Sequence, residues 1–293
     1  MNHDDLDPAL DPALDQYSRR AFIERVGTTT VAAAFLGTEA AAQRPGEALK
    51  DQSLVRQEVD FPSGETRVKA FLCRPKTPGR RGSVIVVHEI FGLNDHIKDL
   101  ACRFARAGCN GLAVNFFTRE GNPPDAAGGF GPVMEFVGRI PDAQVLRDVR
   151  AAVKFLESRP DSNGKVGLVG YCWGGRVAML AAAGVPELDA AVAYYGRIRL
   201  AAKNERQTHG AIDLVDQVRV PILGHFGAAD QGIPVSDVEA YRNALKAAGK
   251  TAEIHIYEGA GHAFNNDTRP SFHPESARLA WQRTLAWFAK HLR

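Results

Sequence analysis

Short apolar runs rich in β-branched residues alternate with helical periods over most of this sequence, and the alternation limits the folds it can adopt. The strand-like runs are residues 67–73, 83–87, 112–116, 165–169, 190–195, 220–226 and 253–257. Between them apolar residues recur every three or four positions, as over 146–156 and 281–292. Such alternation implies crossover connections, a mostly parallel sheet and helices on both faces. We therefore predict an α/β fold.

No long linker interrupts the pattern, so residues 43–293 are predicted to form one domain. The exception to the regular alternation is the glycine-rich stretch at 121–131, GNPPDAAGGFG. A loop of this length commonly carries function. We expect it to be a lid or a wall of a pocket.

Charge and cysteine usage exclude several classes of partner and cofactor. The formal net charge is +2 with no basic stripe, which argues against nucleic acid as a partner. The four cysteines are Cys73, Cys102, Cys109 and Cys172. They form no C-x-x-C pair, so structural zinc and a dithiol redox motif are not expected. We predict no metal or other cofactor, no disulfide framework, and thiols that are mostly small buried apolar groups.

Residues 1–42 differ in composition from the rest. Arg19 and Arg20 precede a modest apolar run at 26–36, and small residues follow at 40–42, as in a twin-arginine export signal. We therefore expect export to the periplasm. Five aspartates before the arginines are unusual for such a signal, so an uncleaved arm on a cytoplasmic protein is the alternative. The apolar run is too short to span a bilayer, so no stable membrane insertion is expected.

The stretch VGYCWGG at 169–175 surrounds Cys172 with glycines. A strand-like run precedes it and a helix-like run, 176–183, follows it. The spacing Gly170-x-Cys172-x-Gly174 is that of a nucleophile elbow with cysteine in place of serine. A helix N-terminus at this point offers free N–H groups and partial positive charge, which favour a thiolate. The alternative is a small buried cysteine in a tight turn.

A thiol nucleophile needs a base, and the base needs an acid that orients it. In α/β-hydrolases these partners follow in the order nucleophile, acid, histidine. His262 lies in a glycine-rich loop directly after the last strand-like run, and Asp230 follows the run before it. Asp237 is a competing acid, but it reads as part of the next helix. We predict a triad of Cys172, Asp230 and His262.

Five motifs together resemble the dienelactone hydrolase family of α/β-hydrolases, the carboxymethylenebutenolidases, over roughly residues 55–293. They are HEIFGLN at 88–94, GYCWGG at 170–175, YYG at 194–196, GAAD at 227–230 and GHAF at 261–264. The resemblance implies an α/β-hydrolase fold, a Cys-Asp-His triad without metal, and hydrolysis of a small-molecule lactone or ester. It also implies that Glu89 contacts the nucleophilic thiol and helps to gate its ionisation.

The resemblance also suggests how substrate is held. Dienelactone hydrolases bind a substrate carboxylate with two arginines; Arg119 matches one, whereas Asn266 occupies the position of the other. We therefore expect weak discrimination in favour of carboxylate-bearing lactones. Tyr171, Tyr195 and Phe264 are further candidates for substrate contact. The backbone N–H groups of Ile90 and Trp173 are expected to form the oxyanion hole.

Two alternatives to a lactone hydrolase remain at this stage. The first is a general carboxylesterase with no preference for lactones. The second is a non-catalytic thiol sensor or binding protein on the same fold, including a redox-switched dimer through Cys102 or Cys109. The retention of both Asp230 and His262 argues against a non-catalytic protein. The natural substrate and the oligomeric state do not follow from the sequence.

Overall fold

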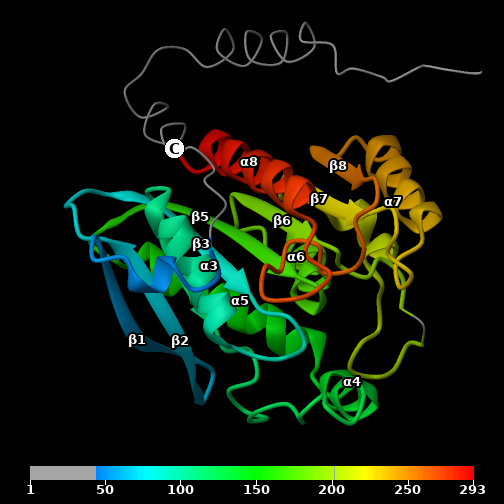
Figure 1. Ribbon diagram of the computed structural model, residues 1–293, viewed down its shortest axis with the longest axis horizontal. Helices are drawn as coiled ribbons and strands as arrows, with labels where there is room; N and C mark the ends of the chain where they lie inside the picture. Colours follow the sequence, from blue (N-terminus) through cyan, green and yellow to red (C-terminus); the bar gives the residue numbers. More distant parts are fainter. Residues whose placement is uncertain (1–43, 201) are drawn as a thin grey trace, which may run out of the picture. The chain divides into compact units, whose positions relative to one another are not determined.

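A central sheet of eight strands organises the chain that the computed structural model describes, residues 44–200 and 202–293 (Figure 1). In spatial order its strands are β1 (Leu54–Ser63), β2 (Thr66–Pro75), β4 (Asn110–Val114), β3 (Arg81–Val87), β5 (Ser162–Tyr171), β6 (Ala190–Tyr194), β7 (Ile222–Gly227) and β8 (Ala252–Tyr257). The described residues all belong to one compact unit, Ala40–Arg293. The predicted segment 1–42 and its boundary at residue 43 lie outside the described residues.

Six neighbouring strands of the sheet, from β4 to β8, run parallel. Only β2 runs in the opposite direction, antiparallel to both of its neighbours, β4 and the edge strand β1. The register sets Val87 of β3 opposite Gly170 of β5, and Tyr171 of β5 opposite Tyr194 of β6. The carboxyl ends of β3, β5 and β6 therefore meet at one edge, where ligands bind in open α/β sheets. The predicted mostly parallel α/β-hydrolase sheet is confirmed.

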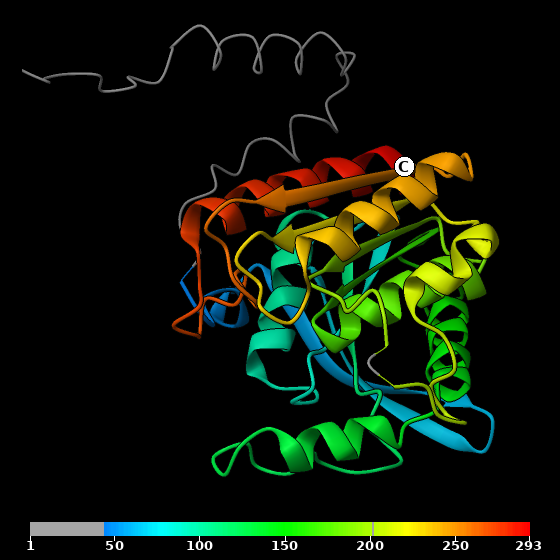
Figure 2. The same cartoon turned by 90° about the vertical axis from the view of Figure 1, so that its right-hand side faces the viewer.

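Helices cover both faces of the sheet (Figures 1 and 2). On one face α3 (Asp95–Arg106) packs against α8 (Pro274–His291), with the rings of Phe104 and Trp281 4.7 Å apart. On the other, α5 (Asp142–Glu157) packs beside α6 (Trp173–Gly184). The helix α7 (Val235–Ala247) lies along β8, and the short helices η1 (Ala48–Lys50) and η2 (Ala211–Gln217) contact α3 and α6.

Two elements were absent from the sequence prediction. The edge strand β1 has the sequence LVRQEVDFPS, in which only Leu54, Phe61 and Ser63 are buried, so it lacks the continuous apolar run of a central strand. The helix α4 (Gly131–Gly138) directly follows the glycine-rich stretch. It stands apart from the sheet, at the end of the molecule that lies lowest in Figure 2.

The sequence predicted no disulfide framework, and this is wrong for two of the four cysteines. Cys73 and Cys102 form a disulfide. Cys73 lies on β2 and Cys102 on α3, and both are fully buried. Their separation of 29 positions in the sequence gives no local signal, but α3 packs across β2 and brings their Cα atoms to 5.2 Å. Cys109 and Cys172 remain free thiols, and Cys109 is buried.

Two further observations concern residues 44–200 and 202–293 only. None of their helices combines the length and the apolar character that crossing a bilayer requires. Nor do three or more of their His, Cys, Asp or Glu side chains converge as they would to hold a metal ion.

Candidate active site

Cys172 stands on a sharp turn between β5 and α6. Its φ of 57° lies in the left-handed region, which a side chain with a Cβ rarely adopts. Its N–H donates to the carbonyl of Tyr194 at 3.0 Å, which ties the turn to the end of β6. Such strain persists only where the surrounding structure enforces it, and it is typical of functional sites.

The glycines on either side of Cys172 are required sterically, as the spacing predicted. A Cβ on Gly170 would overlap the backbone carbonyl of Gly174. A Cβ on Gly174 would lie 2.5 Å from the carbonyl oxygen of Val87, at the end of β3. The start of α6 can therefore touch the ends of β3 and β5 only because these positions carry no side chain.

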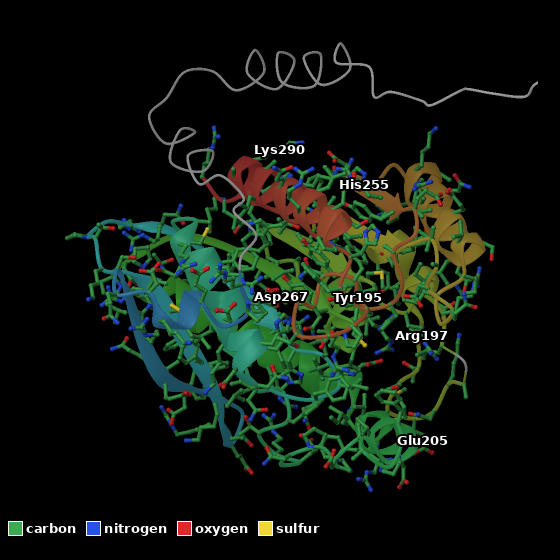
Figure 3. All side chains as sticks on the ribbon, in the orientation of Figure 1. Tyr195, Arg197, Glu205, His255, Asp267 and Lys290 are labelled. Atoms are coloured by element: carbon green, nitrogen blue, oxygen red, sulfur yellow. A yellow bond between two sulfur atoms is a disulfide. The ribbon has the colours of Figure 1, made fainter. Side chains whose placement is uncertain are left out.

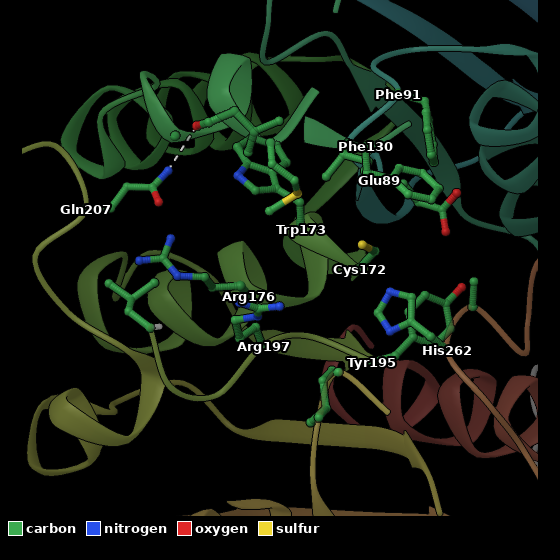
Figure 4. Close-up of a pocket in the computed structure, with 18 of the residues that line it drawn as sticks. Glu89, Phe91, Phe130, Cys172, Trp173, Arg176, Tyr195, Arg197, Gln207 and His262 are labelled. Atoms are coloured by element: carbon green, nitrogen blue, oxygen red, sulfur yellow. Dashed lines mark hydrogen bonds between the residues drawn. The ribbon is translucent and has the colours of Figure 1, made fainter. Parts of the chain in front are cut away.

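Asp230 and His262 meet beside this turn. Asp230 lies in the loop after β7 and His262 in the loop after β8. The carboxylate of Asp230 is almost fully buried, whereas the ring of His262 is partly exposed. Asp230 Oδ2 lies 2.7 Å from His262 Nδ1, and its Oδ1 accepts the N–H of Gly232 at 2.8 Å. Figure 4 shows the His262 ring next to the Cys172 side chain. The three residues of the predicted triad are thus brought together.

The environment of His262 favours its protonated form. Burial opposes the charge, but the hydrogen bond to Asp230 and the proximity of Cys172 outweigh it and raise the pKa of His262 to about 10. An imidazolium at neutral pH can donate a proton. The competing acid Asp237 is on α7, where its carboxylate pairs with Arg199 at 2.9 Å. Of these two carboxylates, it is therefore that of Asp230 that contacts the His262 imidazole.

Glu89 follows β3 directly and lines the same cavity as Cys172. Its carboxylate is 2% exposed overall, and Oε2 accepts a hydrogen bond from Asn266 Nδ2 at 2.9 Å. No hydrogen bond joins Glu89 to Cys172 among the described residues. In this structure the carboxylate is therefore directed to Asn266 rather than to the thiol.

Asn266 is part of a buried polar cluster that anchors the loop after β8. Its Oδ1 accepts the N–H and the hydroxyl of Thr268, at 3.1 and 2.6 Å. The next residue, Asp267, is labelled in Figure 3. Its carboxylate accepts a hydrogen bond of 2.5 Å from Arg103 of α3. Since the same loop carries His262, these contacts fix the position of the imidazole as well.

A cavity of about 480 Å³ opens beside Cys172 (Figure 4). Glu89, Cys172, Tyr195 and His262 line one part of it. The rest is mainly apolar, and its larger members are Ile90, Phe91, Phe130, Met134, Val137, Trp173 and Ile233. This size and this mixture of apolar walls with a few polar groups are typical of sites for small molecules.

The helix α4 and the residue before it form one wall of this cavity. Phe130, Met134 and Val137 all face it. Gln207 donates from Nε2 to the carbonyl of Val137 at 3.0 Å and so ties the end of α4 to the loop before η2 (Figure 4). The glycine-rich stretch contributes only Phe130 to this cavity, so the predicted pocket wall is in large part the helix that follows it.

The prediction that Arg119 binds substrate disagrees with its surroundings. Its guanidinium donates to both carboxylate oxygens of Asp148, at 2.6 and 3.0 Å, and to the carbonyl of Ser63. Asp148 is fully buried and needs a cation to offset the cost of burying its charge. Arg119 is therefore committed to the core and is not part of the cavity wall.

The other substrate-contact candidates divide in the same way. Tyr195 lines the cavity, with its ring 5.3 Å from that of His262. Tyr171 and Phe264 are fully buried beneath it, against Tyr194 and Tyr257, and Asn266 is engaged by Glu89. None of these three reaches the cavity. A match to a family motif therefore does not tell which of its residues face the cavity and which pack behind it.

Sequence reasoning missed Arg176 and Arg197, and it suggested only the third arginine of the cavity, Arg269, as a partial replacement for the arginine absent at Asn266. Arg176 is buried and forms a bidentate ion pair with Asp142, at 2.7 and 2.8 Å. Arg197 and Arg269 also line the cavity and form no ion pair with any described residue. The Arg269 guanidinium lies 4.3 Å from the centre of the Phe91 ring. No spacing rule connects these positions, because they come from three different loops or helices.

Two backbone N–H groups beside Cys172 are free. Trp173 is the first residue of α6 and has no carbonyl four residues earlier in the same helix to accept its N–H. Neither its N–H nor that of Ile90 has an acceptor among the described residues. Both residues line the cavity. These are the two groups that the sequence suggested for an oxyanion hole.

The dienelactone hydrolase family model matches residues 68–292 of this chain. A Methylorubrum extorquens protein, provisionally named carboxymethylenebutenolidase, is 36% identical over 276 residues, which are 94% of this chain and 93% of that protein. A Bradyrhizobium protein, provisionally named 2-oxo-3-(5-oxofuran-2-ylidene)propanoate lactonase, is 34% identical over 78% of this chain and 92% of its own. A crystal structure from Klebsiella pneumoniae, provisionally named dienelactone hydrolase, superposes with a TM-score of 0.76 at 40% identity. It covers 82% of this chain and 100% of its own.

The pKa of His262 provides the first testable prediction. Replacing Asp230 with Asn removes the carboxylate that stabilises the imidazolium, so the pKa of His262 should fall toward the ordinary value near 6.5. An NMR titration of the imidazole C–H signals measures this midpoint. Asp237→Asn is the control, because Asp237 pairs with Arg199 and should leave the midpoint unchanged. An unchanged midpoint in Asp230→Asn would contradict the assigned pair.

Proposed function

Because this chain belongs to the dienelactone hydrolase family and is a hydrolase of that family, we propose that it cleaves small lactones or carboxylic esters through a thioester on Cys172. The observation that carries this proposal is the strained Cys172 at the start of α6, next to the hydrogen-bonded pair of Asp230 and His262. The cavity of about 480 Å³ beside them is large enough for a small ester.

Acylation begins with the thiolate. The N-terminus of α6 favours negative charge on the sulfur, and the raised pKa of His262 supplies a positive imidazolium next to it. The sulfur attacks the acyl carbon, and the carbonyl π electrons move onto oxygen. The N–H groups of Ile90 and Trp173 stabilise that oxyanion. When the C–O bond breaks, His262 protonates the leaving oxygen and a thioester remains on Cys172.

Deacylation reverses the role of His262. Now neutral, the imidazole takes a proton from water while the oxygen of the water attacks the thioester carbon. The C–S bond breaks, the acid product leaves, and the thiolate forms again beside the imidazolium. A thiolate leaves a tetrahedral intermediate more readily than an amine does, so this site suits lactones and activated esters better than amides.

Cys172→Ala should therefore abolish hydrolysis. We expect kcat/KM on a panel of chromogenic esters and unsaturated lactones to fall by about 10³-fold or more, with an unchanged circular dichroism spectrum. Cys172→Ser should retain little activity, because a hydroxyl needs stronger activation than a thiol. Cys109→Ala is the matched control, since this free thiol is buried away from the cavity. Near wild-type turnover in Cys172→Ala would refute the assigned nucleophile.

The substrate specificity should reflect an apolar cavity. Arg119 is bound to Asp148, and Asn266 is bound to Glu89. Neither of the two positions that match the family's carboxylate-binding arginines is therefore available to bind a substrate carboxylate. Phe130 and Met134 of the α4 wall are 55% and 47% exposed, which is unusual for side chains of this size. We propose that they cover an apolar group of the substrate and that a substrate carboxylate contributes little. The enzyme should then also accept neutral, bulkier esters.

Phe130→Ser tests the apolar wall. Loss of partial ring burial should remove about 1 kcal/mol, or about fivefold in kcat/KM, for phenyl-bearing acyl esters and leave acetyl esters unaffected. Val235→Ser is the control, because Val235 is the other exposed large apolar residue and lies outside the cavity. A matched acid and methyl ester should differ by less than about tenfold in the wild type. Equal losses for both acyl groups, or an acid preference above about 100-fold, would contradict the proposal.

We propose export through the paired arginines, Arg19 and Arg20. The Cys73–Cys102 disulfide supports it, because disulfides persist mainly in oxidising compartments. Replacing both arginines with lysine should move the protein from the periplasmic to the cytoplasmic fraction, since the receptor reads the arginine pair. Cell fractionation with a cytoplasmic and a periplasmic marker measures the distribution. The same distribution in the variant would indicate an ordinary N-terminal arm.

A further inference from the structure

His88 directly follows β3 and stands immediately before Glu89 and Ile90. Its side chain is fully buried, and the reaction described above does not use it. A buried histidine with no role in proton transfer is usually a core residue whose two ring nitrogens have found partners. One of the partners of His88, however, is the carbonyl of Glu89, which shares a peptide with the Ile90 N–H of the candidate oxyanion hole.

The two hydrogen bonds of His88 determine its tautomer. The N–H of Phe116 donates to Nε2 at 3.2 Å, so Nε2 carries no proton. Nδ1 must then carry it, and it donates to the carbonyl of Glu89 at 2.7 Å. Burial lowers the pKa of His88 to about 4, so the ring keeps this one donor and one acceptor at neutral pH.

The hydrogen bond to Glu89 also fixes the next N–H. The C=O of Glu89 and the N–H of Ile90 belong to one planar peptide, and no cis peptide occurs among the described residues. In a trans peptide these two groups point in opposite directions. A carbonyl held toward His88 therefore directs the Ile90 N–H away from it, and this N–H has no other partner among the described residues. Ile90 lines the cavity with Cys172.

The same imidazole contacts the residue that carries the second donor. It stacks on the indole of Trp173, with centroids 5.3 Å apart and planes inclined by 16°. Phe117 packs edge-on against His88 at 4.4 Å and limits movement of the ring. One buried side chain thus links the peptide after β3 to the first residue of α6.

We propose that His88 is a positioning residue that sets the spacing and direction of the two oxyanion-hole N–H groups, those of Ile90 and Trp173. The inference rests on the proposed thioester mechanism. His88 touches neither the substrate nor the sulfur; it acts through the Glu89–Ile90 peptide and the Trp173 ring. It should therefore matter for steps that form an oxyanion and not for other reactions of the thiol.

Two reactions of Cys172 separate this role from general support of the fold. Ester hydrolysis passes through an oxyanion. Alkylation by iodoacetamide does not, because the sulfur displaces iodide at a saturated carbon. A third measurement uses a trifluoromethyl ketone, which Cys172 attacks to form a hemithioketal. This adduct carries an oxyanion but does not turn over, and ¹⁹F NMR follows its formation.

Three variants isolate the interaction. His88→Phe keeps a ring to stack on Trp173 but removes both hydrogen bonds. His88→Gln can accept from the N–H of Phe116 and donate to the carbonyl of Glu89, so it should restore most of the lost activity. His225→Phe is the control, because His225 is another fully buried histidine, bonded to Tyr257 and Thr284 away from the cavity.

In His88→Phe we expect kcat/KM for esters to fall on the order of 100-fold, mainly through kcat, with weaker ketone binding. The alkylation rate should stay within about twofold of wild type, as should ester turnover in folded His225→Phe. Unchanged turnover in His88→Phe, or an equal loss of turnover and alkylation, would overturn the assignment of His88. Wild-type protein that is alkylated but neither hydrolyses esters nor binds the ketone would instead refute the proposed function.

Discussion

The close approach of α6 to the ends of β3, β5 and β6 is the constraint on which the site depends. Gly170 and Gly174 allow it, because a Cβ at either position would collide with backbone. The approach puts Cys172 at φ 57° and fixes its N–H on the carbonyl of Tyr194 at 3.0 Å. It also brings the free N–H of Trp173 to the peptide that follows β3. A looser turn would relieve the strain at Cys172 and separate these groups.

The acid and the base come from more distant parts of the chain and are held by other means. Asp230 is buried and accepts two hydrogen bonds, so its charge is stabilised where His262 needs it. The loop that carries His262 is fastened to α3 through Asp267 and Arg103, which are both largely buried. Breaking such a pair leaves an uncompensated buried charge, which is costly. The site therefore combines a thiol, the proposed nucleophile, fixed by steric contact with an imidazole, the proposed base, fixed by buried charges.

Several polar side chains near the site contact other parts of the chain rather than the ligand. Arg119 neutralises the buried Asp148, Asn266 binds Glu89, and His88 bridges two chain segments. The cations that do line the cavity without an ion pair among the described residues, Arg197 and Arg269, come from positions that no motif marks. Residue type at a matching position is thus weak grounds for a binding role, because the partner of a side chain decides what it is free to contact. By the same reasoning the cavity combines an apolar wall with two arginines that its motifs do not mark, whereas Arg119 and Asn266 are engaged elsewhere.

The sequence alone determined the order and type of most strands and helices and the turn at Cys172, and it predicted that Asp230 and His262 would lie beside that turn, because these features follow from local periodicity and from the order of parallel strand ends. Only the tertiary structure decided which neighbouring residues face the cavity. It placed the carboxylate of Glu89 on Asn266, joined Cys73 to Cys102 across β2 and α3, and turned Phe130 and Met134 toward the thiol. The physical reason is that these contacts join segments far apart in the chain, and their partners are chosen by packing and by the need to pair buried charges. No spacing rule in the sequence encodes that choice.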